Sequence, residues 1–244
     1  MEQELESPLA TLSGRVAALD WMGIAAGLDA FGCATTGPLL TSGECAAIVG
    51  LYAEDALFRT RIVMARHGFG SGEYKYFAAP LPPWLTALRG ALYGALAPIA
   101  NRWSEALGTP ATYPPGHADY LARCHAAGQT RPTPLLLRYE AGDYNCLHQD
   151  LYGALAFPIQ VAFLLSGPGK DFTGGEFVLT EQRPRQQSRA DVVPLCQGEG
   201  VVFAVSQRPV QGRRGVHRVT MRHGVSRLRG GIRMTLGVIL HDAA

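Results

Sequence analysis

Two histidines and one aspartate have the spacing of a metal-binding site. His148 and Asp150 lie two residues apart in the segment RYEAGDYNCLHQDLYG, and His223 follows about 70 residues later. Because side chains alternate along a β-strand, His148 and Asp150 would emerge on one face while Gln149 points away. Two imidazoles and one carboxylate occupy three corners of an octahedron, which leaves room on Fe(II) for a co-substrate and O₂. The pattern therefore predicts a metal site with His223 as the third ligand.

An arginine further along the chain is a candidate for binding an anion. Arg233 lies ten residues after His223, beyond Gly230 and Gly231, which we expect to form the turn of a short hairpin. Such a hairpin would return the guanidinium to the metal cavity as a bidentate clamp for a carboxylate. Thr235 shares a strand face with Arg233 and would add a hydroxyl donor. The alternative is a salt bridge to a protein carboxylate, because an unpaired buried charge is very costly.

These residues and their spacing resemble the Fe(II)/2-oxoglutarate dioxygenase superfamily, whose pattern is HxD, a long gap, a second histidine and then an arginine. Tyr139-x-x-Gly142 resembles the strand that enters the metal site in prolyl-hydroxylase-like members and in oxidative demethylases of alkylated bases. FTGGEF at 172–177 resembles the GGE turn of the prolyl-hydroxylase branch, and GEGVVF at 198–203 resembles the strand before the second histidine. The resemblance covers about residues 133–242. The whole chain is also similar to uncharacterised bacterial 2OG-Fe(II) oxygenases.

The resemblance implies a metal, two co-substrates and a reaction. Fe(II) would be the metal, 2-oxoglutarate and O₂ would be the co-substrates, and ascorbate is an additional candidate cofactor. The enzyme would hydroxylate a substrate C–H bond and release succinate and CO₂. The implied catalytic residues and metal ligands are His148, Asp150 and His223, and the implied co-substrate residues are Arg233, Thr235 and Tyr139. The chain departs from the prolyl-hydroxylase pattern at Asn145, where a tyrosine is usual.

A second histidine competes for the role of third ligand. The segment from His223 to Arg233 fits the superfamily form His-x-Val-x-x-x-x-x-Gly-x-Arg, whereas His217 lies sixteen residues before the arginine. We therefore prefer His223 and keep His217 as the alternative. The other histidines lack metal-like spacing, and we expect core or surface roles for them: His67, His117, His125 and His241.

The pattern of apolar residues predicts an α+β fold. Thr41 to Glu44 has capping-box spacing before an amphipathic segment, apolar residues recur every three or four positions over 84–107, and a third helix is expected over 116–127. After Pro134 the chain changes to short β-rich stretches separated by Gly and Pro. We expect one domain over 1–244, with a helix-rich part at 1–130 packed on a double-stranded β-helix, or jelly roll, at 131–244.

The overall composition limits the classes of protein. The chain has 244 residues, 47% of them hydrophobic, which is enough for one full core. The acidic N-terminus and the lack of a long apolar run predict a soluble cytoplasmic protein that does not enter a membrane. Five cysteines without any CxxC argue against structural zinc and a disulfide framework, so we expect reduced thiols.

Charge and aromatic residues leave the substrate open. The segment 200–241 holds eight arginines and no acid, and its 208–229 part either solvates a loop or forms a positive rim for an anionic partner such as nucleic acid. Tyr74, Tyr76 and Phe77 would stack a flipped base or form an ordinary edge strand. Prolyl-type hydroxylation of a protein is preferred over oxidative dealkylation of nucleic acid, because no second arginine follows Arg233. A non-catalytic jelly-roll module for binding or sensing is the third possibility.

Overall fold

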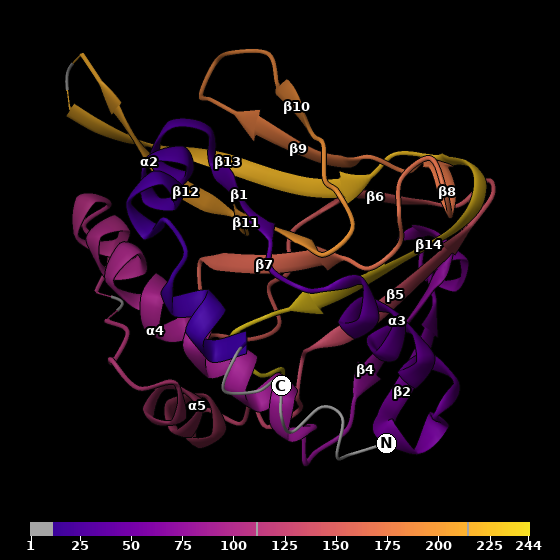
Figure 1. The fold of residues 1–244 in the computed structure, drawn as a ribbon. Helices are drawn as coiled ribbons and strands as arrows, with labels where there is room; N and C mark the ends of the chain where they lie inside the picture. The colour runs from indigo at the N-terminus through magenta and orange to yellow at the C-terminus, as the bar shows by residue number, and fades with distance from the viewer. Residues whose placement is uncertain (1–11, 111, 214) are drawn as a thin grey trace.

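The chain folds into two antiparallel β-sheets that face one another, with helices outside the larger sheet (Figure 1). The computed structural model describes residues 12–110, 112–213 and 215–244. Within these residues the larger sheet has eight strands and the smaller has six. This architecture confirms the predicted α+β class and the jelly-roll core.

The larger sheet has the order β1-β11-β7-β14-β5-β4-β2, and β8 pairs with β14. Its strands are β1 (Cys33–Pro38), β2 (Phe58–Val63), β4 (Glu73–Phe77), β5 (Leu135–Glu140), β7 (Ile159–Leu164), β8 (Phe172–Gly174), β11 (Glu199–Ala204) and β14 (Leu228–Val238). Strand β7, with sequence IQVAFL, is buried at every position because the helices cover one face of the sheet and the second sheet covers the other.

The smaller sheet has the order β10-β9-β13-β6-β3, and β12 pairs with β13. Its strands are β3 (Gly70–Ser71), β6 (Tyr144–His148), β9 (Phe177–Gln182), β10 (Arg189–Val193), β12 (Gln207–Gly212) and β13 (Gly215–Val225). Strand β9 alternates between buried and more exposed residues, which is the pattern of a sheet with one solvated face. The inner face of this sheet therefore turns toward the larger sheet.

Helices cover the outer face of the larger sheet (Figure 1). They are α2 (Trp21–Phe31), α3 (Ser42–Gly50), α4 (Pro83–Ala106) and α5 (His117–Ala126), with short 3₁₀ turns η1 (Leu51–Ala53), η2 (Asp55–Leu57) and η3 (Met64–Arg66). The buried leucines of α4 join the same hydrophobic core as Phe163 and Leu236 of the sheet. The predicted capping box is present, since Thr41 and Glu44 bond to each other's backbone N–H at the start of α3.

The first part of the chain contributes strands as well as helices. Strands β1, β2 and β4 extend the larger sheet, and β3 extends the smaller one, so the predicted helix-rich part at 1–130 is mixed. The expectation of an edge strand at Tyr74, Tyr76 and Phe77 is wrong, because β4 lies between β5 and β2. The single-domain organisation stays a prediction.

The predicted turn at Gly230 and Gly231 is also wrong. Both glycines lie inside β14, and the chain turns from β13 to β14 at Ser226 and Arg227. Gly231 has φ +79° where β14 pairs with β8, and a Cβ there would lie 2.0 Å from the backbone oxygen of Asp171. Gly231 therefore allows a close approach of the Asp171 backbone where β14 pairs with β8, and no hairpin turn forms there.

Further expectations concern membrane insertion, cellular location and the cysteines. Among the described helices, none has the length and apolar character needed to cross a bilayer. The cytoplasmic location stays a prediction, and the N-terminal residues 1–11 and Arg214 lie outside the described residues. The five cysteines form no disulfide within the described residues, and Cys45 and Cys124 are buried.

Candidate metal centre and co-substrate cavity

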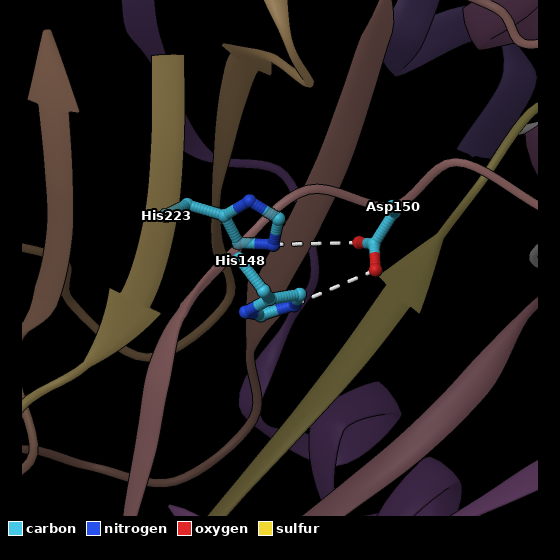
Figure 2. A group of neighbouring side chains, drawn as sticks. All are labelled: His148, Asp150 and His223. Carbon is cyan, nitrogen blue, oxygen red and sulfur yellow. Dashed lines mark ion pairs between the residues drawn. The ribbon is translucent and has the colours of Figure 1, made fainter. Parts of the chain in front are cut away.

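The three predicted ligands meet at the inner face of the smaller sheet. His148 ends β6 and is the register partner of His223 on β13, while Asp150 follows just beyond β6. One potential ligand atom from each residue lies within 4.8 Å of the others. Figure 2 shows both imidazoles turned toward the carboxylate, with Nε2 of His148 3.4 Å from Oδ1 and Nε2 of His223 3.3 Å from Oδ2.

The local electrostatics keep these groups in states that suit metal binding. Burial alone would raise the pKa of Asp150, but hydrogen bonds from the two imidazoles hold it well below its usual range. Burial lowers the pKa of His148, yet the hydrogen bond and charge of Asp150 outweigh this and leave it raised. Burial lowers the pKa of His223. The carboxylate of Asp150 is thus ionised, and a bound cation would displace the proton that His148 directs at it.

Neighbouring groups orient the ligands. Nδ1 of His148 lies 2.8 Å from the backbone oxygen of Cys146, which holds a proton on Nδ1 and directs Nε2 toward Asp150 as the potential ligand atom. Gln149 points the other way, as predicted, and donates to the backbone oxygens of Met221 and Ser206 at 2.8 and 3.2 Å. It thereby ties the HxD segment to β13. The donor set and its orientation fit a site of two histidines and one carboxylate.

Arg233 and Thr235 lie in the same cavity as the three ligands. The cavity has a volume of about 340 Å³ and lies between the two sheets. Arg233 is only 2% exposed, donates to the Thr235 hydroxyl at 2.6 Å, and forms no ion pair within the described ranges. Burial lowers its pKa to about 10. Its Nε also lacks a partner among the described residues. A buried guanidinium without a carboxylate partner suits the binding of an anionic ligand.

Tyr139 lies beside the arginine and does not line the cavity. It is fully buried on β5, opposite Arg233 in register, and its ring centroid lies 5.8 Å from the guanidinium carbon. Its hydroxyl accepts a hydrogen bond from Asn145 at 3.3 Å. Asn145, the residue that departs from the prolyl-hydroxylase pattern, is part of the cavity wall. Tyr139 and Asn145 therefore form a polar pair at the end of the cavity where Arg233 lies.

The alternative ligand His217 lies away from the centre. It occupies the β12–β13 hairpin as the register partner of Val210, six residues before His223, and it does not belong to the cluster of three. Among the described residues, no other histidine joins that cluster either. The geometry favours the choice of His223 that the spacing indicated.

Among the described arginines of the segment 208–229, none lines the cavity. Arg208 is fully buried, pairs with Glu181, and donates to backbone oxygens at the end of α2. Arg218 and Arg222 are exposed, but they alternate with buried residues on β13 and lie on the opposite face from His223. For Arg218 and Arg222 the structure favours the alternative of a solvated surface over a positive rim, because strand alternation turns them away from the cavity.

The aromatic residues of the cavity differ from those expected. Tyr74 lines the cavity, whereas Phe77 belongs to the hydrophobic core. Phe69, which had no predicted role, lines the mouth with its ring 48% exposed and stacked on His67. Tyr152 was also missed, although it continues the two-residue spacing of His148 and Asp150 and donates to Asp150 Oδ1 at 2.6 Å.

Comparisons with known proteins agree with this fold. An oxidoreductase of the 2OG-Fe(II) oxygenase family from Burkholderia pseudomallei is 18% identical, with a TM-score of 0.53 over 92% of each chain. A Trichoplax adhaerens prolyl hydroxylase, solved with a hypoxia inducible factor peptide, is 14% identical, with a TM-score of 0.53 over 94% of this chain and 92% of that one. An uncharacterised protein of Mycobacterium tuberculosis is 52% identical over 168 residues, which are 69% of this chain and 72% of the relative.

A jelly roll with this cluster of ligands defines a 2-oxoglutarate-dependent Fe(II) oxygenase, an oxidoreductase that uses Fe(II), 2-oxoglutarate and O₂. Within this class the chain belongs to the Oxygenase-NA family, whose model matches residues 72–243. That family is described as an oxygenase catalysing oxidative methylation of damaged DNA. The superfamily resemblance and the predicted enzyme class are thus confirmed.

Proposed function

We propose that His148, Asp150 and His223 bind Fe(II) and that the enzyme oxidises alkyl groups on nucleic acid bases. The observation that carries the metal assignment is the buried Asp150 carboxylate held between two imidazole Nε2 atoms. Each of these three residues offers one potential ligand atom, and these atoms lie within 4.8 Å of one another. The adjoining cavity has room for further metal ligands. The iron supplies oxidising power when bound, together with 2-oxoglutarate and O₂, so that a C–H bond is hydroxylated and succinate and CO₂ are released.

Arg233 and Thr235 bind the distal carboxylate of 2-oxoglutarate in this proposal. The guanidinium is buried without an acidic partner in the described ranges, so a dicarboxylate would replace the solvation that the cation has lost. The Thr235 hydroxyl, already 2.6 Å from Nη1, would donate to the same carboxylate. Tyr139 stays a predicted co-substrate residue, and its position supports an indirect contribution through Asn145. Ascorbate also stays a prediction.

The choice of nucleic acid as substrate rests on the family and on the cavity mouth. The family description names damaged DNA. A base must leave its stack to reach a buried centre, and aromatic side chains at the entrance stabilise the extruded or neighbouring base by stacking. Phe69 at the mouth and Tyr74 on the wall are suitably placed for this role. Hydroxylation of an N-alkyl carbon gives a hemiaminal that releases an aldehyde, so the reaction has a distinct product.

Two assays on the purified protein test the proposal. Anaerobic addition of Fe(II) and 2-oxoglutarate should produce a visible charge-transfer band. In air, an N-methylated oligonucleotide should then yield succinate and formaldehyde in equal amounts, whereas the unmethylated strand should yield neither above background. The same assay with proline-containing peptides serves as the comparison.

The possible outcomes separate the alternatives. Succinate and a gain of one oxygen on peptides, without formaldehyde from oligonucleotides, would support the protein hydroxylation preferred from the sequence. The lack of both the band and succinate would contradict the proposed site and leave a binding module.

A further inference from the structure

Tyr152 is not one of the three proposed ligands, but its side chain forms a hydrogen bond with the carboxylate of Asp150. Its hydroxyl donates to Oδ1 at 2.6 Å, a short distance for a hydrogen bond to an ionised oxygen. Oδ1 also lies 3.4 Å from His148 Nε2, whereas Oδ2 of the same carboxylate faces His223 Nε2 at 3.3 Å. The two oxygens of Asp150 are therefore inequivalent, because the tyrosine hydroxyl occupies only one of them.

We propose that Tyr152 is a positioning residue that makes Asp150 bind the metal through Oδ2 alone. This inference rests on the metal site of the proposed function. A carboxylate that binds through both oxygens occupies two positions around a metal, whereas one oxygen leaves a position free. With two histidines and one oxygen bound, three corners of the octahedron stay open, enough for a bidentate 2-oxoglutarate and one O₂. Loss of the hydroxyl would let Oδ1 turn to the metal and occupy one of these positions.

Other contacts hold the tyrosine in place. Its ring packs edge to face on Tyr76, with centroids 6.3 Å apart, and lies 6.1 Å from the ring of His241. Its backbone oxygen accepts a hydrogen bond from the backbone N–H of Ala244 at 3.0 Å. The guanidinium carbon of Arg59 in turn lies 4.4 Å from the ring centroid of Tyr76. The hydroxyl is thus directed at Asp150 by β4 and by the end of the chain, and it needs no rearrangement to orient the ligand.

The test uses Co(II) as the probe, because its visible bands report the number and geometry of its ligands. Tyr152→Phe removes only the hydroxyl, so the ring contacts stay. We expect the variant to bind Co(II) about 10- to 100-fold more weakly than the wild type, the usual effect of losing a group that orients a metal ligand. Its Co(II) bands should also shift, since Asp150 becomes free to bind through both oxygens.

Tyr113→Phe is the matched control. Tyr113 is a buried tyrosine whose hydroxyl donates to a backbone oxygen, that of Ala156, at 3.2 Å and takes no part in the cavity wall. This variant should keep the affinity and bands of the wild type. The melting temperature of each protein in EDTA separates a general loss of stability from an effect on the metal.

Unchanged Co(II) affinity and bands in Tyr152→Phe would overturn the inference, even if the melting temperature fell, because the hydroxyl would then serve stability alone. A wild type that binds no Co(II) would contradict the proposed metal site itself. Since the second result concerns the wild type and the first only the variant, the two failures are distinguishable.

Discussion

Arg233→Met should make the metal-free protein more stable while it weakens binding of 2-oxoglutarate. Methionine keeps an unbranched apolar stem and removes the charge. Burial lowers the pKa of Arg233 to about 10, from about 12.5 in water. Each tenfold change in proton affinity equals about 1.36 kcal/mol, so the buried charge costs about 3 kcal/mol. The variant also loses the hydrogen bond to Thr235, worth about 1 kcal/mol.

The net expectation is a gain of about 2 kcal/mol in the free energy of unfolding, or about 4–8 °C in melting temperature for a chain of this size. Circular dichroism in EDTA measures it. Affinity for 2-oxoglutarate should fall by about 2–5 kcal/mol, the usual effect of removing one partner of a buried charge pair, which corresponds to roughly 30- to 5,000-fold. Calorimetry with the Co(II) protein measures this second change, and Co(II) binding itself should persist.

Arg208→Met is the matched control from the same arginine-rich segment. Arg208 is equally buried but pairs with Glu181 and donates to two backbone oxygens of α2, so its removal leaves Glu181 paired with Arg183 alone and should cost about 1–3 kcal/mol. The two substitutions are therefore expected to change stability in opposite directions. A less stable Arg233→Met protein in EDTA would refute the reasoning, because it would mean that a protein group already compensates this guanidinium.

Four further substitutions test other parts of the structure. His223→Ala should abolish Co(II) binding in a calorimetric titration, whereas His217→Ala should bind normally; the reverse pattern would favour the alternative ligand. Gly231→Ala should lower the free energy of unfolding by about 3 kcal/mol or more, because φ is +79° and the Cβ would meet the backbone oxygen of Asp171 at 2.0 Å. Urea denaturation measures this change, and an unchanged midpoint would contradict the close approach of the two backbones. Burial alone would raise the pKa of Asp242, but its ion pair with Arg89 lowers it in the folded protein. Ionised Asp242 therefore stabilises the fold above about pH 3.9, the pKa of an unfolded aspartate. This contribution is lost as the pH falls through the lower pKa of the folded state. Asp242→Asn should therefore be less stable at pH 7 and lose less on acidification, and parallel pH–stability curves would be inconsistent with the pair.

Local spacing in the sequence predicted that His148 and Asp150 would lie together, and the superfamily form indicated that His223 would join them. His148 and Asp150 emerge together because side chains alternate at the end of β6, and His223 faces them on the neighbouring strand. The same spacing of two extends to Tyr152, so that residue was also within reach of sequence reasoning. Side-chain alternation thus brings two of the three proposed ligands together, and the pairing of β6 with β13 adds His223.

Long-range pairing was harder to predict. Gly230 and Gly231 have the composition of a turn, but their conformation is set by β8, more than fifty residues earlier in the chain. Arg208 has the composition of a charged surface, but Glu181 on β9 makes it a core residue. Such contacts depend on which strands become neighbours, and local composition does not specify that.

The most direct measurement of the central claim is anomalous diffraction from crystals of the wild type grown with Mn(II). The proposed site predicts one strong peak at bonding distance from Nε2 of His148, Nε2 of His223 and a single oxygen of Asp150, and an added 2-oxoglutarate with its distal carboxylate on Arg233. A peak at other residues, or none at full metal occupancy in solution, would contradict the site on which the proposed oxidation depends.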